Sequence, residues 1–310
     1  MTIFLRLVLA AAVLGAAAGL VLGAVPSLHP AADSFAHFRV HFAAILGFAA
    51  VLLALFARGT ARFLLLGSSA AMAMGIAWAW LDAPPSETAQ DGLTVLQFNM
   101  LYRNAAIADV IARLREHEAE IVTLQEVTSS SLTRLEALVD LYPHRRHCRF
   151  GRVGGVAILS QHPFRGEATC LDGRGLVVQT IDAPSGPLTV ASLHTHWPWP
   201  MGQHGQIDGW IETLRKIEGT AIVAGDFNAA PWSHAVGRIE AASDTAAISG
   251  LRRTIVVTLR RLGLTVGVPI PIDHILVTDD LCPLAIRTLD QTGSDHFPVI
   301  ATLRRGGCEG

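Results

Sequence analysis

The distribution of apolar and polar positions divides the chain into two parts. Before about residue 82, apolar residues run on in three segments without a charge, at 7–25, 42–57 and 63–81. The outer two segments have the length that a helix needs to cross a hydrocarbon layer about 30 Å thick, and the middle one reaches it only if His41 and the residue before it are included. The pattern predicts about three transmembrane helices. The alternatives are buried apolar helices and, for the first segment, a cleaved signal peptide.

From about residue 93 the pattern changes to short apolar runs separated by helical stretches and turns. This alternation is typical of an α/β or α+β sandwich. Helical spacing covers 106–116 and about 205–217, and strand-like runs lie within 94–98, 121–126, 156–160, 188–193, 221–231, 272–277 and 293–299. We therefore expect a membrane anchor at 1–82, a short linker at 83–92 and a folded domain at 93–306.

Composition follows the same division. Hydrophobic residues make up 51% of the 310 residues, the mean hydropathy is +0.40, and most of the excess lies before residue 82. From Asp91 onward there are 20 Arg and Lys against 23 Asp and Glu. The folded domain thus lacks the basic surplus that is typical of proteins bound to a polyanion such as duplex DNA.

The arginines predict an orientation in the membrane. Arg58 and Arg62 lie between the second and third apolar segments, whereas acidic residues follow the third. The positive-inside rule therefore places Arg6 and this connection in the cytoplasm, and the folded domain on the outer, periplasmic side of the cytoplasmic membrane. Arg39, before the second segment, favours the opposite orientation.

The four cysteines show no CxxC pair and no zinc-site spacing. If the domain faces an oxidising compartment, Cys148 and Cys170 are candidates for a disulfide. Unpaired thiols are the alternative.

Polar residues of a particular kind stand where the apolar runs of the domain end. They are Asn99, Glu126, His194, Asp226, Asn228, Asp273, Asp295 and His296. Any one of them has a structural explanation, such as a turn or a hydrogen-bonded core residue. Together they predict a common site, because strand ends often meet at one edge of a sheet. Oxygen ligands without a Cys or His cage suit Mg²⁺ or Mn²⁺, and histidines nearby can donate hydrogen bonds to a phosphoryl oxygen.

The motifs in this order resemble the endonuclease/exonuclease/phosphatase superfamily, the metal-dependent fold of DNase I. They are Gln97-Phe98-Asn99, Leu124-Gln125-Glu126, Gly155 to Ser160 with Pro163, Ser192-Leu193-His194, Gly225-Asp226-Phe227-Asn228, Ile272-Asp273-His274-Ile275 and Ser294-Asp295-His296. They cover roughly residues 93–303. The resemblance implies a four-layer α/β sandwich with two central sheets. Apolar helices before such a domain resemble membrane-anchored bacterial members.

The resemblance also implies a metal site for Mg²⁺ or Mn²⁺. Glu126 matches the metal-binding glutamate of the family, and Asn99 matches the asparagine that supports the same region. Asp295 matches an additional acid on the metal side.

The catalytic residues follow from the same comparison of motifs. Asp226 matches the aspartate that positions the attacking water, and Asn228 matches the amide that contacts phosphate. His194 stands where the family has a residue near the scissile phosphate. His296 matches the histidine that contacts the phosphoryl group, and Asp273 the carboxylate that orients it.

Some positions leave alternatives open. His196 competes with His194 for the phosphate-side role, and Leu101 stands where some nucleases have a second acid. The arginine pairs 252/253 and 260/261 either face a phosphate-rich substrate or are solvated helix charges. Trp197 and Trp199 either stack on a base, dip toward lipid or cover the core.

The sequence therefore predicts a membrane-anchored, metal-dependent phosphoesterase. We expect it to hydrolyse a phosphodiester in nucleic acid or a lipid head group by metal-assisted attack of water. The alternatives are a phosphomonoesterase acting on a phosphorylated lipid or inositol, and a non-catalytic binding or scaffold module of the same fold.

Overall fold

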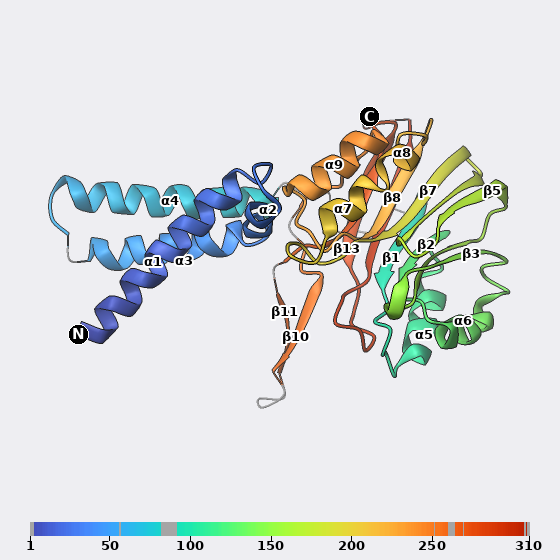
Figure 1. Ribbon diagram of the computed structural model, residues 1–310, viewed down its shortest axis with the longest axis horizontal. Helices are drawn as coiled ribbons and strands as arrows, with labels where there is room; N and C mark the ends of the chain where they lie inside the picture. Colours follow the sequence, from blue (N-terminus) through green and yellow to red (C-terminus); the bar gives the residue numbers. More distant parts are fainter. Residues whose placement is uncertain are drawn as a thin grey trace.

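The chain is organised as a group of apolar helices beside a two-sheet domain (Figure 1). The computed structural model describes residues 3–55, 57–81, 92–250, 252–259, 264–268, 270–306 and 308. The helices of the first part are α1 (Ile3–Ala24), α2 (Pro30–Ala36), α3 (Arg39–Ala54) and α4 (Thr60–Leu81). Helix α2 stands at the end of the group that adjoins the domain (Figure 1). The predicted linker at 83–92 lies outside the described residues, apart from Gly92.

The apolar helices support fewer membrane spans than the three predicted. Within the described residues, the segment Thr60–Ala77 of α4 is long and apolar enough to cross a membrane by itself. Helices α2 and α3 reach that length only as a pair bent by 60°, and the described apolar part of α1 is the shorter helix Ala10–Ala24. Helix α2 was not predicted, because its Asp33 and Ser34 are polar and the apolar segment was counted only from residue 42.

Two mixed sheets form the domain. In spatial order, the first sheet contains β13 (Leu281–Thr288), β14 (Val299–Arg305), β1 (Leu93–Asn99), β2 (Ile121–Gln125), β4 (Gly155–Ser160) and β3 (His144–Arg149). The second contains β5 (Phe164–Leu171), β6 (Leu176–Ala183), β7 (Gly186–His194), β8 (Ala221–Asp226), β12 (Asp273–Val277) and β9 (Ala246–Ala247). β1 is parallel to β2 and β7 is parallel to β8. A separate hairpin is formed by β10 (Ile255–Leu259) and β11 (Leu264–Val268).

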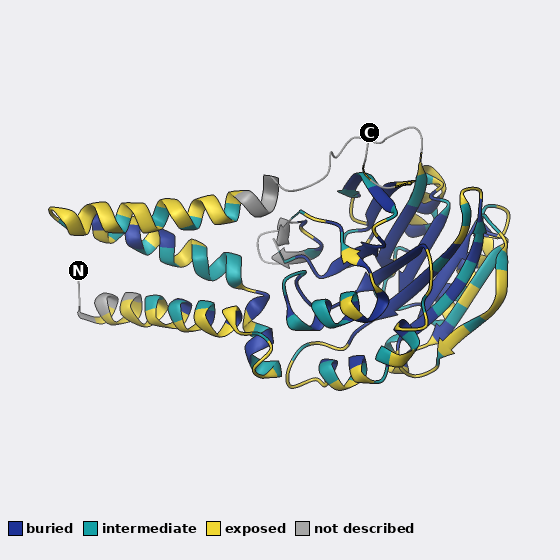
Figure 2. Ribbon diagram, turned by 90° about the horizontal axis from the view of Figure 1, so that it is seen from above, coloured by how far each residue is buried: buried dark blue, intermediate teal, exposed yellow. Residues whose placement is uncertain are grey.

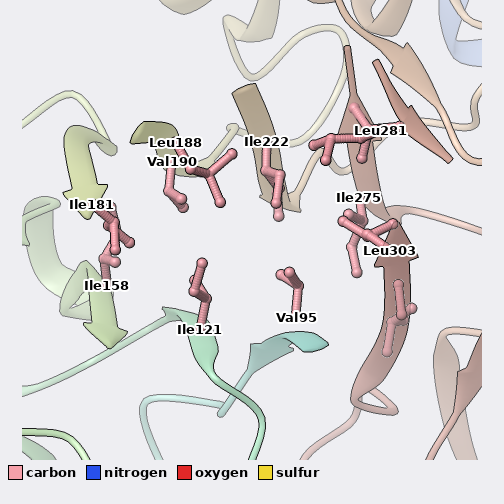
Figure 3. Close-up of a cluster of buried hydrophobic side chains, with 14 of the residues drawn as sticks. Val95, Ile121, Ile158, Ile181, Leu188, Val190, Ile222, Ile275, Leu281 and Leu303 are labelled. Atoms are coloured by element: carbon pink, nitrogen blue, oxygen red, sulfur yellow. The ribbon is translucent and has the colours of Figure 1, made fainter. Parts of the chain in front are cut away.

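The sheets pack face to face over an apolar core. Val95 and Ile121 of the first sheet point toward Ile222 and Val190 of the second, and Ile158 lies beside Ile181 (Figure 3). Because their other faces are covered by helices, the central strands are buried on both sides and consist of nearly continuous apolar runs (Figure 2).

Helices cover the outer face of each sheet. On the first sheet lie α5 (Ile107–His117), α6 (Ser129–Leu135) and the 3₁₀ turn η1 (Glu136–Leu138), with a second 3₁₀ turn, η2 (Gly151–Val153), before β4. On the second lie α7 (Gln203–Asp208), α8 (Ile211–Leu214) and α9 (His234–Ser243). Helix α5 buries Ile107, Val110 and Leu114, which follow one another at helical spacing. The α/β sandwich expected from the resemblance is confirmed.

Local differences from the prediction have physical causes. The continuous helix expected at about 205–217 is wrong, because the chain forms α7 and α8 with Gly209 and Trp210 between them. Strand β3 was missed, because its sequence His-Arg-Arg-His-Cys-Arg is polar. It lies at the edge of its sheet, where charged side chains remain in water.

All four cysteines are paired in disulfides. Cys148 and Cys170 join β3 of the first sheet to β5 of the second, with Cα atoms 5.7 Å apart. Cys282 and Cys308 join β13 to the C-terminal segment. The first pair is one of the two alternatives left open by the sequence.

Candidate active site

Polar residues at the strand ends come together at one end of the two sheets. Parallel β7 and β8 pair His194 with Asp226, and antiparallel β12 pairs Asp273 with Asp226. These three residues therefore form a row across the end of the second sheet. In the first sheet, parallel β1 and β2 bring Asn99 beside the end of β2, which Glu126 follows.

Asp226 is the centre of this group and is 1% exposed. Its Oδ2 accepts a hydrogen bond from Asn99 Nδ2 at 2.9 Å, and its Oδ1 accepts one from the backbone N–H of Asn228 at 2.8 Å. His194 Nε2 and His296 Nε2 lie 3.4 Å and 3.8 Å from Oδ2. The carboxylate is thus held by an amide and faced by two imidazoles.

Asp273 and His296 form a buried pair beside Asp226. His296 Nδ1 donates to Asp273 Oδ2 at 2.8 Å. The other oxygen, Asp273 Oδ1, accepts from Gln97 Nε2 at 3.0 Å. These bonds fix the His296 ring so that its Nε2 faces Asp226 and the space beside it.

Electrostatics place a positive charge on His296 and a negative one on Asp226. Burial alone would raise the pKa of Asp226, but the charge of His296 and the hydrogen bonds from His194 and Asn99 outweigh it and hold the pKa at about 2. Burial would likewise lower the pKa of His296, yet the carboxylates of Asp273 and Asp226 raise it to about 10. Burial raises the pKa of Asp273 above its ordinary value, although His296 opposes this.

Glu126 is held by Asn99 and by the backbone of the loop that follows β1. Its Oε2 accepts from the N–H of Tyr102 at 2.7 Å, and its Oε1 accepts from Asn99 Nδ2 at 3.2 Å. The Glu126 backbone has a φ of 57°, which is unusual for a residue other than glycine. Such strain is found at functional sites, where the surrounding contacts impose it.

Two buried polar atoms of the site have no hydrogen-bond partner within the described residues. They are Oδ1 of Asn228 and Nδ1 of His194. The Asn228 side chain is otherwise fixed, because its Nδ2 donates to the Thr195 carbonyl at 2.9 Å. Unpaired buried polar atoms are costly, so their presence indicates that water or a ligand completes the site.

His194 rather than His196 lies next to Asp226. His194 is buried at the end of β7, whereas His196 is exposed, and its backbone N–H donates to Gln206 Oε1. Both rings contact Phe150, at centroid distances of 5.2 Å and 5.1 Å.

Asp295 occupies the exposed edge of the site. Its side chain is 57% exposed and its Oδ1 lies 4.0 Å from His296 Nε2. Of the three residues predicted on the metal side, Asp295 therefore lies beside His296, whereas Asn99 and Glu126 are hydrogen-bonded to each other.

Behind the site lies a buried polar network to which the sequence prediction assigned no role. Gln97 Nε2 donates to Gln125 Oε1 as well as to Asp273, and so connects the two sheets. Ser294 Oγ donates to the Asn99 carbonyl and accepts from the N–H of His296. The sequence contained a signal for this network, because an amide side chain such as Gln97 inside an apolar strand requires a buried hydrogen-bond partner.

The donor set fits a divalent cation. Carboxylates of Glu126, Asp226 and Asp273 lie in or around one site, and hard cations such as Mg²⁺ prefer such oxygens. Single ligand atoms of Asp226, Asp273 and His296 lie within 4.8 Å of one another. Glu126, which is joined to Asp226 through Asn99, supplies a further carboxylate beside this cluster.

For Arg252, the structure shows neither of the two alternatives that the sequence left open, substrate contact or a solvated helix charge. Arg252 is buried, and its guanidinium donates to the carbonyls of Ser249 and Ile248 at 2.7 Å. This residue precedes a strand rather than standing on a helix. Residues 260 and 261 lie outside the described part of the chain.

Comparison with known proteins identifies relatives of this domain. Residues 96–296 match the endonuclease/exonuclease/phosphatase family. A search of curated proteins found no match.

Solved structures share the fold at low sequence identity. An endonuclease/exonuclease/phosphatase from Beutenbergia cavernae is 19% identical, with a TM-score of 0.54 over 70% of this chain and 72% of that one. TDP2 of D. rerio, complexed with a single-strand DNA product, is 13% identical, with a TM-score of 0.57 over 69% of this chain and 100% of that one. The human Nocturnin catalytic domain with bound sulfate is 17% identical, with a TM-score of 0.56 over 69% and 94%.

Proposed function

The chain belongs to the endonuclease/exonuclease/phosphatase family, and from its site we propose that it is a metal-dependent phosphoesterase that hydrolyses a phosphodiester by attack of water. The observation that carries this proposal is the position of Asp226. This buried, ionised carboxylate is held by Asn99 and faced by His194 and His296. Such a group is suited to orient a water molecule for attack on phosphorus.

Each residue of the site has a distinct role around the scissile phosphate. Asp226, with a pKa of about 2, stays ionised and accepts a hydrogen bond from the attacking water. His296 donates a hydrogen bond from its Nε2–H to a phosphoryl oxygen, and Asp273 keeps the ring charged and oriented. Asn228 and His194 supply further polar contacts. A divalent ion, when held by Glu126, would stabilise the negative charge that develops on the phosphoryl group.

We also propose that the apolar helices hold the domain at the outer face of the cytoplasmic membrane. Phe63 and Leu64 of α4 are 75% and 69% exposed, and much of the helix surface is exposed (Figure 2). Exposed apolar surface of this extent suits lipid. The connection from α3 to α4, which contains Arg58, lies at the end of the helices away from the domain (Figure 1). Disulfides in the domain favour an oxidising compartment.

The test uses the full chain in detergent micelles with bis-(p-nitrophenyl) phosphate. Hydrolysis is expected with Mg²⁺ or Mn²⁺, and it should cease on addition of EDTA. The variant Asp226→Asn keeps the shape of the side chain and is expected to lose turnover. Equal turnover in this variant and in wild type would remove Asp226 from the mechanism. Absence of turnover in wild type on this diester and on phosphomonoesters would favour the non-catalytic binding module.

A further inference from the structure

Helix α2 connects the apolar helices to the two-sheet domain through buried hydrogen bonds. The carboxylate of Asp33 is 1% exposed and accepts hydrogen bonds from the backbone N–H groups of His234 and Ala235, at 2.7 Å and 2.9 Å. These are free N–H groups in the first turn of α9, so Asp33 acts as an additional cap contributed from another part of the chain. His204 Nε2 lies 3.0 Å from the same carboxylate.

Further contacts of α2 extend this connection to the active site. Trp232 Nε1 donates to the Ala36 carbonyl at 2.6 Å. The ring of His37, which follows α2, is buried, and its Nδ1 lies 3.0 Å from the carbonyl oxygens of Asp33 and Ser34. Because Trp232 follows Asn228 closely in the chain, these contacts give the active site a defined position relative to the apolar helices.

An exposed apolar loop lies between the active site and these helices. This loop, residues 196–202, is called the tryptophan loop below. Its Trp197, Trp199 and Met201 side chains are 57%, 56% and 63% exposed. Large apolar side chains exposed side by side in this way indicate a contact surface.

The base of the tryptophan loop is rigid and joined to the site. Gln203 Nε2 donates to the His196 carbonyl and to Thr195 Oγ1, at 3.0 Å and 3.1 Å. Gln206 Nε2 donates to the carbonyl of His194 at 3.0 Å. These hydrogen bonds hold the two ends of the loop that carries the exposed tryptophans.

The tryptophan loop adjoins the helix group directly. The ring of His29, at the start of α2, meets the Trp199 ring edge to face at a centroid distance of 6.5 Å. The neighbouring Leu28 is also exposed. The exposed apolar surface of the helices therefore continues onto the tryptophan loop, on the side of the domain that faces α2 (Figure 1).

We propose that the tryptophan loop lies in the headgroup layer of the bilayer and that the active site takes a phosphate ester carried by a membrane lipid. This inference rests on the proposed function and on the proposed attachment to a membrane. Tryptophan favours the interface between lipid and water, because its ring is apolar and its N–H is polar. Stacking on nucleic acid bases is the competing use of exposed tryptophans, but the domain lacks the excess of cations that tracks a phosphate backbone.

Lipid contact can be measured by labelling the full chain with a thiol-reactive fluorophore. All four native cysteines are in disulfides, so an introduced cysteine is the only free thiol. Trp199→Cys is labelled in the tryptophan loop, and Val139→Cys, an exposed apolar position beside α6, is the matched control. In vesicles containing brominated phosphatidylcholine, we expect loss of fluorescence at position 199 and none at 139. Equal fluorescence at both positions would overturn the proposal.

Substrate class is measured on the same full chain in vesicles of phosphatidylcholine, phosphatidylethanolamine and phosphatidylglycerol. Three substrates are compared: the vesicle lipids, a single-stranded oligonucleotide and bis-(p-nitrophenyl) phosphate. We expect release of a water-soluble lipid head group and no cleavage of the oligonucleotide. The double variant Trp197→Ser/Trp199→Ser should reduce lipid hydrolysis about tenfold, because less apolar surface enters the interface, and should reduce hydrolysis of the small diester much less.

The outcomes separate this inference from the proposed function. Hydrolysis of the small diester without any lipid product, cleavage of the oligonucleotide in preference to lipid, or full lipid hydrolysis by the double variant would each overturn the lipid assignment. Failure of wild type on all three substrates would overturn the proposed function itself.

Discussion

Asn99 Nδ2 donates a hydrogen bond to Asp226 Oδ2 at 2.9 Å, and this bond joins the end of β1 in one sheet to the end of β8 in the other. The same amide nitrogen lies 3.2 Å from Glu126 Oε1. A single amide therefore holds the carboxylate proposed to orient water and the carboxylate proposed to bind metal. The spacing between the two depends on how the sheets pack.

Replacing Asn99 by Ala should lower kcat about 10²- to 10³-fold, as loss of one precisely positioned donor does in other active sites. The two carboxylates would remain but would no longer be held together. Steady-state kinetics on the small diester measure the effect. Gln161→Ala removes an amide that bonds the Glu118 carbonyl on the surface, and this control should leave kcat unchanged. A normal kcat for Asn99→Ala would contradict the bridging role.

The pair of Asp273 and His296 predicts an unusual pH dependence. Burial would lower the pKa of His296, but the neighbouring carboxylates raise it to about 10, so the proton that it donates is present below that pH and lost above it. Activity should therefore persist into the alkaline range and fall as the pH rises through about 10. In Asp273→Asn the pKa of His296 falls, and the alkaline limb should move to lower pH. The pH profile of kcat/KM and the NMR titration of His296 test this, and an unshifted limb would speak against the pair.

His274 predicts sensitivity of the fold to acid. Burial lowers its pKa to about 4, although its bond to the Ala229 carbonyl partly offsets this. The unfolded chain takes up a proton below about pH 6.5, while the folded chain does so only near pH 4. The free energy of unfolding should therefore fall as the pH is lowered from about 6.5 to about 4. In His274→Gln, denaturant titrations at several pH values should show that the free energy of unfolding depends less steeply on pH. The same pH dependence as in wild type would exclude His274 as the cause.

The contact between α2 and α9 predicts a contribution to stability from outside the two-sheet domain. Asp33→Ala leaves the N–H groups of His234 and Ala235 without this acceptor, which should destabilise the domain by about 1–3 kcal/mol. Thermal unfolding of the full chain measures the effect. Asp140→Ala, which breaks an exposed ion pair with Arg115, is the control and should change Tm little. An equal effect of both substitutions would show that α2 adds no specific stabilisation.

The disulfide between β3 and β5 should stabilise the domain by reducing the conformational entropy of the unfolded chain. Its sequence separation is 22 residues, for which loop closure predicts about 3 kcal/mol. The double variant Cys148→Ser/Cys170→Ser should unfold at lower urea concentration. If this variant were as stable as wild type under oxidising conditions, the pair would not be formed in solution.

Much of the candidate site was predictable because its residue types follow apolar runs that are local in the chain. Asp226 at the end of β8, Asn228 just beyond it and Asn99 at the end of β1 could be predicted from the positions where strands end. Gln97 and Ser294 were present in the same motifs but received no role, because their partners lie on other strands. Neither alternative considered for Arg252, substrate contact or a solvated charge, was right, because its burial depends on packing that the polar sequence does not reveal.

The sequence by itself determined the division into an apolar part and an α/β domain, the family and the kinds of side chain at the site, because apolar periodicity and motif order are properties of short segments. Only the tertiary structure decided which of these groups meet. Gln97 reaches Asp273 across 176 residues, and Asp33 caps a helix 201 residues away. The bend after α2 and the outward position of the tryptophan loop were likewise decided there. Such contacts depend on strand register and on the packing of one layer against the next, and neither is encoded in any single segment.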